Sequence, residues 1–170
     1  MSRQTQNRRA RTRYLCHAAI IASIYIVLTY LASMLDLASG AIQLRLSEAL
    51  CILTVFTPAA IPGLTLGCLI SNYVTGCLPI DILFGTLATL LGALGGRYLR
   101  RKPYLAPLPT VLANTLIVPF VLSWAYHVEE GLPFLFLTVG IGELLSAYAL
   151  GVLLYHPIKK NQGKLFNYFE

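Results

Sequence analysis

The segment Thr57-Pro-Ala-Ala-Ile-Pro-Gly63 interrupts an apolar stretch of 30 residues, from residue 47 to residue 76. A membrane-crossing helix needs about 20 apolar residues, so this stretch forms either one long span or two short ones. Pro58 and Pro62 both oppose a continuous helix, because proline lacks a backbone N–H and disfavours the helical conformation in the residue before it. We therefore expect two short helices with a break at these prolines.

The composition indicates that the whole chain is embedded in a membrane. Of the 170 residues, 56% are hydrophobic and only 12% are charged, which is about half the charged share of a typical soluble domain. The length also excludes an enzyme with separate catalytic and cofactor domains. Four further apolar runs are long enough to cross about 30 Å of hydrocarbon, at residues 14–35, 79–96, 107–126 and 133–155.

The basic residues predict the number of crossings. Twelve of the thirteen Lys and Arg residues form three clusters, namely Arg3, Arg8, Arg9, Arg11 and Arg13; Arg97, Arg100, Arg101 and Lys102; and Lys159, Lys160 and Lys164. Basic loops stay in the cytoplasm, so an even number of crossings separates the first two clusters. That condition requires two spans within residues 47–76. We predict a single all-α domain, residues 1–170, in the cell membrane: six transmembrane helices over residues 14–155, with segments 1–13 and 156–170 cytoplasmic.

Small residues recur four positions apart, which places each pair on one helix face. Gly63 and Gly67 form one such pair, and Gly92 and Gly96 form another. We expect both glycine pairs to pack helices together within the bundle. A third pair, Ala18 and Ala22, lies near the cytoplasmic end of the first helix, where a partner protein can reach it, and Ala19 and Ser23 repeat this spacing one residue later.

Three carboxylates, Glu48, Asp81 and Glu143, lie within or at the edge of the apolar spans. Each costs about 2.5 to 3.5 kcal/mol at the centre of a membrane helix unless it has a partner or a wet cavity. Either they form helix-to-helix hydrogen bonds or they serve a function. The predicted topology gathers them with other polar residues in the outer half of the bundle, where we expect a ligand pocket open to the outside. Its predicted residues are Gln43, Arg45, Glu48, Asn72, Asp81, Asn114 and Glu143.

These residue types suit a polar ligand that is rich in hydrogen-bond donors. A carboxylate accepts two adjacent N–H groups, as the edge of a guanine-like base presents them, and an amide or Arg45 can donate to a ring carbonyl. A cationic amine would suit Asp81 or Glu143 equally well. Trp124, Tyr73 and Tyr126 are expected near the same end, either as interfacial anchors or stacked on a planar ligand.

Other functions lack the required residues. The four Cys and three His residues have no metal-binding spacing, and Gly163-Lys164 lacks the glycine pattern of a phosphate loop. We therefore expect no cofactor, no metal and no intrinsic ATPase activity. An intramembrane enzyme is disfavoured because Ser71 and Ser146 have no His at comparable depth, and a channel because the inner half is apolar. The basic amino terminus is a topology anchor rather than a nucleic-acid site.

Five segments in the same order resemble the QueT family. They are Gln43-Leu-Arg-Leu-Ser-Glu-Ala-Leu50, Phe56-Thr-Pro-Ala-Ala-Ile-Pro-Gly63, Leu66-Gly-Cys-Leu-Ile-Ser-Asn72, Leu78-Pro-Ile-Asp-Ile-Leu-Phe-Gly85 and Gly142-Glu-Leu-Leu145. The resemblance implies a substrate-binding S component of an energy-coupling factor (ECF) transporter, which captures a queuosine-related 7-deazaguanine compound outside the cell. It also implies a membrane T component and two cytoplasmic ATPases as partners.

The resemblance implies roles for the predicted residues. Glu143 and Glu48 would accept hydrogen bonds from the base edge, and Asp81 would bind an aminomethyl group or a ribose. The orienting groups would be Gln43, Arg45, Asn72 and Asn114, and the T component would dock on Ala18 and Ala22. An S component for another vitamin or nucleobase is the alternative. The sequence leaves open whether the cargo is the free base, its aminomethyl or nitrile precursor, or the nucleoside.

Overall fold

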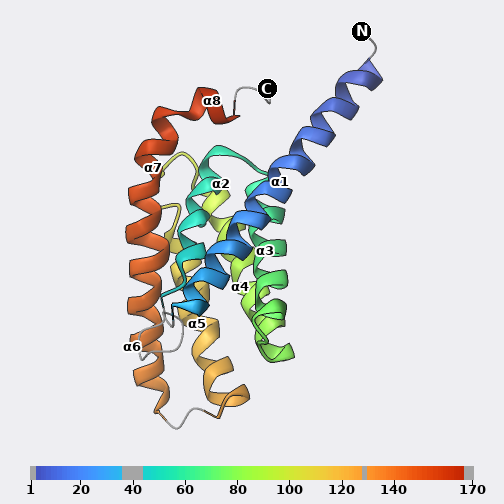
Figure 1. The fold of residues 1–170 in the computed structure, drawn as a ribbon. Helices are drawn as coiled ribbons and strands as arrows, with labels where there is room; N and C mark the ends of the chain where they lie inside the picture. The colour runs from blue at the N-terminus through green and yellow to red at the C-terminus, as the bar shows by residue number, and fades with distance from the viewer. Residues whose placement is uncertain (1–2, 36–43, 128–129, 167–170) are drawn as a thin grey trace.

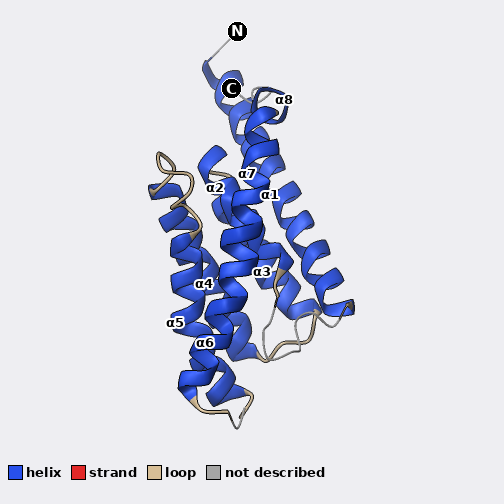
Figure 2. Ribbon diagram, turned by 90° about the vertical axis from the view of Figure 1, so that its left-hand side faces the viewer, coloured by secondary structure: helices blue, strands red, loops and turns tan. Residues whose placement is uncertain are grey.

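A computed structural model describes residues 3–35, 44–127 and 130–166. Within these ranges every regular element is a helix (Figures 1 and 2). In chain order they are α1 (Arg3–Met34), η1 (Leu46–Ile52), α2 (Leu53–Phe56), α3 (Ala60–Val74), α4 (Pro79–Tyr98), α5 (Leu108–Ala125), α6 (Leu132–Glu143), η2 (Leu144–Ala149), α7 (Leu150–Lys160) and α8 (Gln162–Phe166). The predicted all-α class is confirmed for the described residues.

Within the described ranges, four helical segments are long and apolar enough to cross a membrane, at Asn7–Met34, Pro79–Tyr98, Leu108–Ala125 and Leu132–Lys160. The last of these joins α6, η2 and α7 into one continuous rod. Two shorter apolar helices, Leu46–Phe56 and Ala60–Val74, lie between the first and second long segments. The protein is therefore a membrane protein, whereas six crossings with both termini in the cytoplasm stay a prediction.

The chain breaks between α2 and α3, as the two prolines predict, but only one of them makes the break. Thr57 is extended, with φ −140° and ψ 137°, which is the conformation that a following proline favours. Its hydroxyl accepts a hydrogen bond from the Ala59 N–H at 3.2 Å. Pro62 instead lies in the first turn of α3, where the missing N–H costs nothing.

The outermost helices extend beyond the apolar runs that predicted them. α1 begins at Arg3 and α7 ends at Lys160, whereas hydrophobicity alone predicted limits at residues 14 and 155. Residues 3–13 contain neither Gly nor Pro and are rich in Arg, which is a good helix former. Helix formation therefore continues into the basic segments, where the apolar pattern gives no signal.

Neighbouring helices pack in the order α1, α3, α4, α5 and α6, and η1 closes the arrangement by contacting both α1 and η2. Every residue of η1 from Ser47 to Ile52 is buried. This short 3₁₀ segment therefore occupies the middle of the bundle, enclosed by the longer helices.

Two glycine-lined seams bring helices close together, and both glycine pairs act within the bundle as predicted. A Cβ atom on Gly67 would lie 2.7 Å from the Cβ atom of Tyr25 in α1, and one on Gly63 would lie 2.9 Å from the Ala18 carbonyl oxygen. A Cβ atom on Gly92 would lie 2.6 Å from the Thr110 hydroxyl in α5. Larger residues would force the helices apart.

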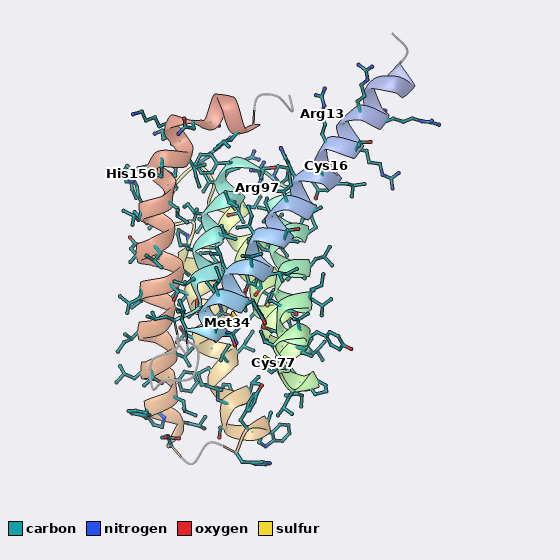
Figure 3. The ribbon with its side chains drawn as sticks, in the orientation of Figure 1. Arg13, Cys16, Met34, Cys77, Arg97 and His156 are labelled. Carbon is teal, nitrogen blue, oxygen red and sulfur yellow. The ribbon has the colours of Figure 1, made fainter. Side chains whose placement is uncertain are left out.

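The basic clusters share one end of the molecule. Figure 3 labels one residue in or near each basic cluster: Arg13, Arg97 and, three residues before Lys159, His156. These three lie at the same end, while Cys77 lies nearer the opposite end. The start of α1 and the short α8 are also at this end (Figure 1). This arrangement defines a basic end and an opposite end for the description of the site.

Candidate ligand-binding site

The first predicted acid, Glu48, lies in η1 and is only 1% exposed. The Tyr25 hydroxyl of α1 donates a hydrogen bond to Glu48 Oε1 at 2.5 Å. One turn further along α1, the Thr29 hydroxyl donates to the Ser47 hydroxyl oxygen at 2.8 Å. Two side chains spaced four residues apart on one face of α1 therefore fix the position and orientation of the start of η1.

Glu143 and Asn114 approach this acid from the other side of η1. Glu143 ends α6, immediately before the π-helical segment η2, and π-helical turns occur frequently at functional sites. The Asn114 side chain of α5 faces the carboxyl groups of both Glu48 and Glu143. Yet among the described residues neither polar atom of the Asn114 amide has a hydrogen-bond partner, and Glu143 Oε2 has none either.

Arg45 connects this group to the third acid. Its guanidinium interacts electrostatically with Asp81, Glu48 and Glu143. Arg45 and Glu143 also line a small cavity of about 10 Å³, which has room for about one water molecule. The pocket open to the outside stays a prediction, since residues 36–43, which include Gln43, lie outside the described residues.

Asp81 and Asn72 form a neighbouring polar site between α3 and α4. Both side chains approach Gly85, with Asn72 Nδ2 at 3.1 Å and Asp81 Oδ1 at 3.5 Å from where its Cβ would be. The Tyr126 hydroxyl donates to Asp81 Oδ2 at 3.0 Å and accepts the Leu78 N–H at 3.2 Å.

The structure thus gathers four of the predicted residues, Arg45, Glu48, Asn114 and Glu143, into one buried polar cluster. Asn72 and Asp81 lie beside it and are linked to it in two ways: Arg45 interacts with both Asp81 and Glu48, and Asn72 Nδ2 donates to Cys68 Sγ at 3.6 Å, next to Tyr25. Gln43 lies outside the described residues. The roles predicted for these residues in binding stay predictions.

The aromatic and small residues are placed less favourably than expected. Tyr73 and Trp124 are 75% and 82% exposed, so neither faces the polar cluster. Trp124 instead lines an apolar groove of about 400 Å³ between α4 and α5, as suits a lipid-facing anchor. Ala18 and Ala22 are buried in the bundle against α3. Their predicted docking role therefore stays a prediction that requires α3 to move or a partner to bind beside them.

The sequence pattern described as QueT transporter matches residues 15–160 of this chain.

The chain belongs to the QueT transporter family.

A curated member of the QueT family, the queuosine precursor transporter QueT of Lactococcus lactis subsp. cremoris (strain MG1363), is 32% identical to this chain over 84 residues. The matched segment covers 49% of each protein, so this QueT-family chain aligns with about half the length of that relative. No solved structure matches the chain.

Sequence reasoning missed Tyr25 and Thr29, which hold η1 in this QueT-family protein. A signal was present in the first apolar run, because Ala18, Ala22, Tyr25 and Thr29 follow one another at intervals of three or four residues. This spacing places them on one helix face. A hydroxyl that shares its face with small packing residues points into the bundle, and such a group needs an internal partner.

Proposed function

We propose that this protein is a substrate-capture (S) component that binds a queuosine-related 7-deazaguanine compound from outside the cell. The observation that carries the proposal is the buried polar cluster with unpartnered atoms on Asn114 and Glu143. Buried polar groups without partners cost about 1 to 3 kcal/mol each. A ligand that supplies the missing hydrogen bonds would offset this cost, and the name of the Lactococcus relative supports a queuosine precursor.

The chemistry of the cluster suits the edge of a guanine-like base. Glu143 and Glu48 provide carboxyl oxygens as acceptors for neighbouring N–H groups. The Asn114 amide and the Arg45 guanidinium supply donors for a ring carbonyl. Of the two roles expected for Asp81, we propose that of partner to a ribose, with Asn72 and Gln43 as orienting groups. The described cavity beside Glu143 holds about one water molecule, so we propose that the bundle around η1 opens when the ligand binds.

We also propose that the chain crosses the membrane six times, with both termini in the cytoplasm. The common position of the three basic clusters at one end of the molecule supports this orientation (Figure 3), because basic segments remain in the cytoplasm. Leu46–Phe56 and Ala60–Val74 supply the two short crossings. The polar cluster would then be reached from the outer side.

Transport is proposed to need an ECF module, in which a membrane T component and two cytoplasmic ATPases drive delivery. The T component would dock on the part of α1 that carries Ala18 and Ala22. Since α3 covers these two residues, a partner reaches the adjacent exposed residues Ala19 and Ser23 first. Ser23→Trp should block uptake in cells that express the module, while ligand binding by the purified protein is unchanged. Uptake at the wild-type rate would exclude this face.

Glu143→Gln tests the binding proposal. This isosteric change keeps the shape of the side chain but removes one acceptor site, so it should abolish binding of 7-deazaguanine compounds and leave the folded yield intact. Glu130→Gln is the matched control. Glu130 is an exposed glutamate just before α6, and this variant should bind like the wild type. Wild-type affinity in Glu143→Gln would remove this residue from its central role.

A ligand panel distinguishes the cargo from that of other S components. Thermal shifts of the purified protein should increase with 7-deazaguanine compounds and not with riboflavin, thiamine, folate or biotin. A shift with one of these vitamins alone would identify an S component of different specificity.

A further inference from the structure

A second level of unpartnered polar atoms lies deeper in the bundle than the cluster described above. The hydroxyl groups of Thr110 in α5 and Ser146 in η2 are buried, and neither has a hydrogen-bond partner among the described residues. Thr110 is 2% exposed and Ser146 is 1% exposed. Neither residue belongs to the polar set that the sequence predicted for the ligand pocket.

Both levels are formed by the same two helical segments, α5 and the α6–η2 rod, and lie about one turn apart along them. On α5, Thr110 precedes Asn114 by four residues, and on the opposing rod Ser146 follows Glu143 by three. Residues three or four apart share a helix face, and α5 and the α6–η2 rod run in opposite directions in Figures 1 and 2. Thr110 and Ser146 therefore both lie about one turn, roughly 5 Å, closer to the basic end than Asn114 and Glu143.

Cys51 of η1 links the two sides of this deeper level. Its thiol lies beside the Thr110 hydroxyl, but it donates to the backbone carbonyl of Ala147 at 3.6 Å. Because the Cys51 side chain contacts both α5 and η2, the segments that carry Thr110 and Ser146 meet beside η1. The deeper level is thus continuous with the cluster around Glu48, three residues earlier in η1.

Among the described residues, the buried hydroxyls without a hydrogen-bond partner are those of Thr86, Thr110, Thr115 and Ser146. Other buried hydroxyls satisfy themselves on their own helix: Thr54 donates to Cys51 O at 2.7 Å, Ser71 to Cys68 O at 3.1 Å and Thr89 to Gly85 O at 3.0 Å. Such local bonds are the ordinary solution for Ser and Thr inside helices. Thr110 and Ser146 make no such bond, and the Thr110 hydroxyl has the Cys51 thiol beside it.

We propose that Thr110 and Ser146 form a second tier of the ligand site, which binds the polar substituent of a 7-deazaguanine compound while Glu48, Asn114 and Glu143 hold the base edge. The inference rests on the proposed function and assigns specificity within it. Each hydroxyl both donates and accepts, so the tier accommodates an aminomethyl or a hydroxyl-bearing substituent. It offers nothing to a base that lacks one.

Two ligands and one double variant test this assignment. Affinities of the full-length protein are measured for unsubstituted 7-deazaguanine and for its 7-aminomethyl derivative. The wild type should prefer the aminomethyl compound by about tenfold, as one or two hydrogen bonds supply. Thr110→Val with Ser146→Ala should remove most of that preference, lowering the affinity for the aminomethyl compound far more than that for the unsubstituted base.

Thr115→Val is the matched control. Thr115 also carries an unpartnered hydroxyl on α5, but it faces Gly140 of α6 rather than the deeper level. This variant should keep the wild-type preference, since only its interface with α6 changes.

The possible outcomes separate the tier from the proposed function. An equal loss of affinity for both compounds, or no change in the preference, would overturn the second tier while leaving the role of Glu143 intact. A wild-type protein that binds neither compound would overturn both proposals. The tier is supported if the preference for the aminomethyl compound is present in the wild type and in Thr115→Val but lost in the double variant.

Discussion

The seam between α1 and α3 and the polar cluster around η1 are adjacent in the bundle, but they are built in opposite ways. In the seam, Gly63 and Gly67 allow the two backbones to approach so closely that no Cβ atom fits. In the cluster, Asn114 and Glu143 are buried with polar atoms that have no partner. The seam is optimised for packing, whereas the cluster retains an energetic cost that packing alone does not explain.

This contrast indicates where the free energy of folding is gained and where it is given up. Close backbone contact is the main source of helix association inside a membrane, because lipid removes most of the hydrophobic driving force. An unpartnered buried polar group costs free energy that a ligand can return. Substitutions in the seam should therefore change stability whether or not ligand is present, and substitutions in the cluster should change the response to ligand.

Gly67→Val should have the largest effect. A Cβ atom at this position would lie 2.7 Å from the Tyr25 Cβ atom and 3.2 Å from the Ala22 Cα atom, so α1 and α3 have to separate. Overpacking of this kind costs about 3 kcal/mol or more, and we expect little folded protein by size-exclusion chromatography in detergent. Gly131→Ala is the control, since its nearest neighbour would be Pro133 Cδ at 3.8 Å. A wild-type yield for Gly67→Val would show that the seam tolerates separation.

Tyr25→Phe should have an intermediate effect, because this residue belongs to both regions. Its Cβ atom packs against Gly67 and its hydroxyl donates to Glu48. Phenylalanine keeps the packing and removes only the hydrogen bond, which is worth about 1 to 3 kcal/mol when its acceptor is a buried carboxyl group. The melting temperature should fall moderately, and ligand affinity should fall as Glu48 loses its fixed orientation.

Tyr25→Leu tests whether packing or the hydroxyl matters more at this position. It removes both the ring and the hydroxyl, so its melting temperature should be lower than that of Tyr25→Phe. If the two variants lose ligand affinity without any loss of thermal stability, the hydrogen bond to Glu48 serves binding alone.

Much of the fold followed from the sequence because the membrane restricts the options to apolar runs of sufficient length. The glycine pairs, Pro58 and the four long apolar segments all have the roles that their patterns predict. The start of α1 at Arg3 was missed, because helix formation in a basic segment depends on backbone propensity and leaves no hydrophobic signal.

The site was predicted less completely. Glu48, Asn114 and Glu143 are expensive in a bilayer wherever they lie, so the sequence alone could single them out. Their grouping beside Asn72 and Asp81 depends on which faces of α3, α4 and α5 meet, and residue type does not encode this. The buried 3₁₀ conformation of η1 was equally invisible, since an apolar run of this length has the same composition as an ordinary helix.

Arg97→Gln should have the smallest effect, because Arg97 lies in neither the seam nor the polar cluster. Arg97 of α4 donates from Nη1 to the carbonyl oxygens of Thr54 and Val55 at 3.1 and 3.2 Å. These two carbonyl groups have no partner within the short α2 helix. Since Arg97 is partly exposed, water can replace these bonds at a cost of about 1 kcal/mol. We expect a small fall in melting temperature with unchanged ligand affinity, whereas the exposed control Arg100→Gln should change neither. A loss of affinity in Arg97→Gln would instead mean that α2 transmits its position to Glu48 through η1, and that the packed and polar regions are energetically coupled.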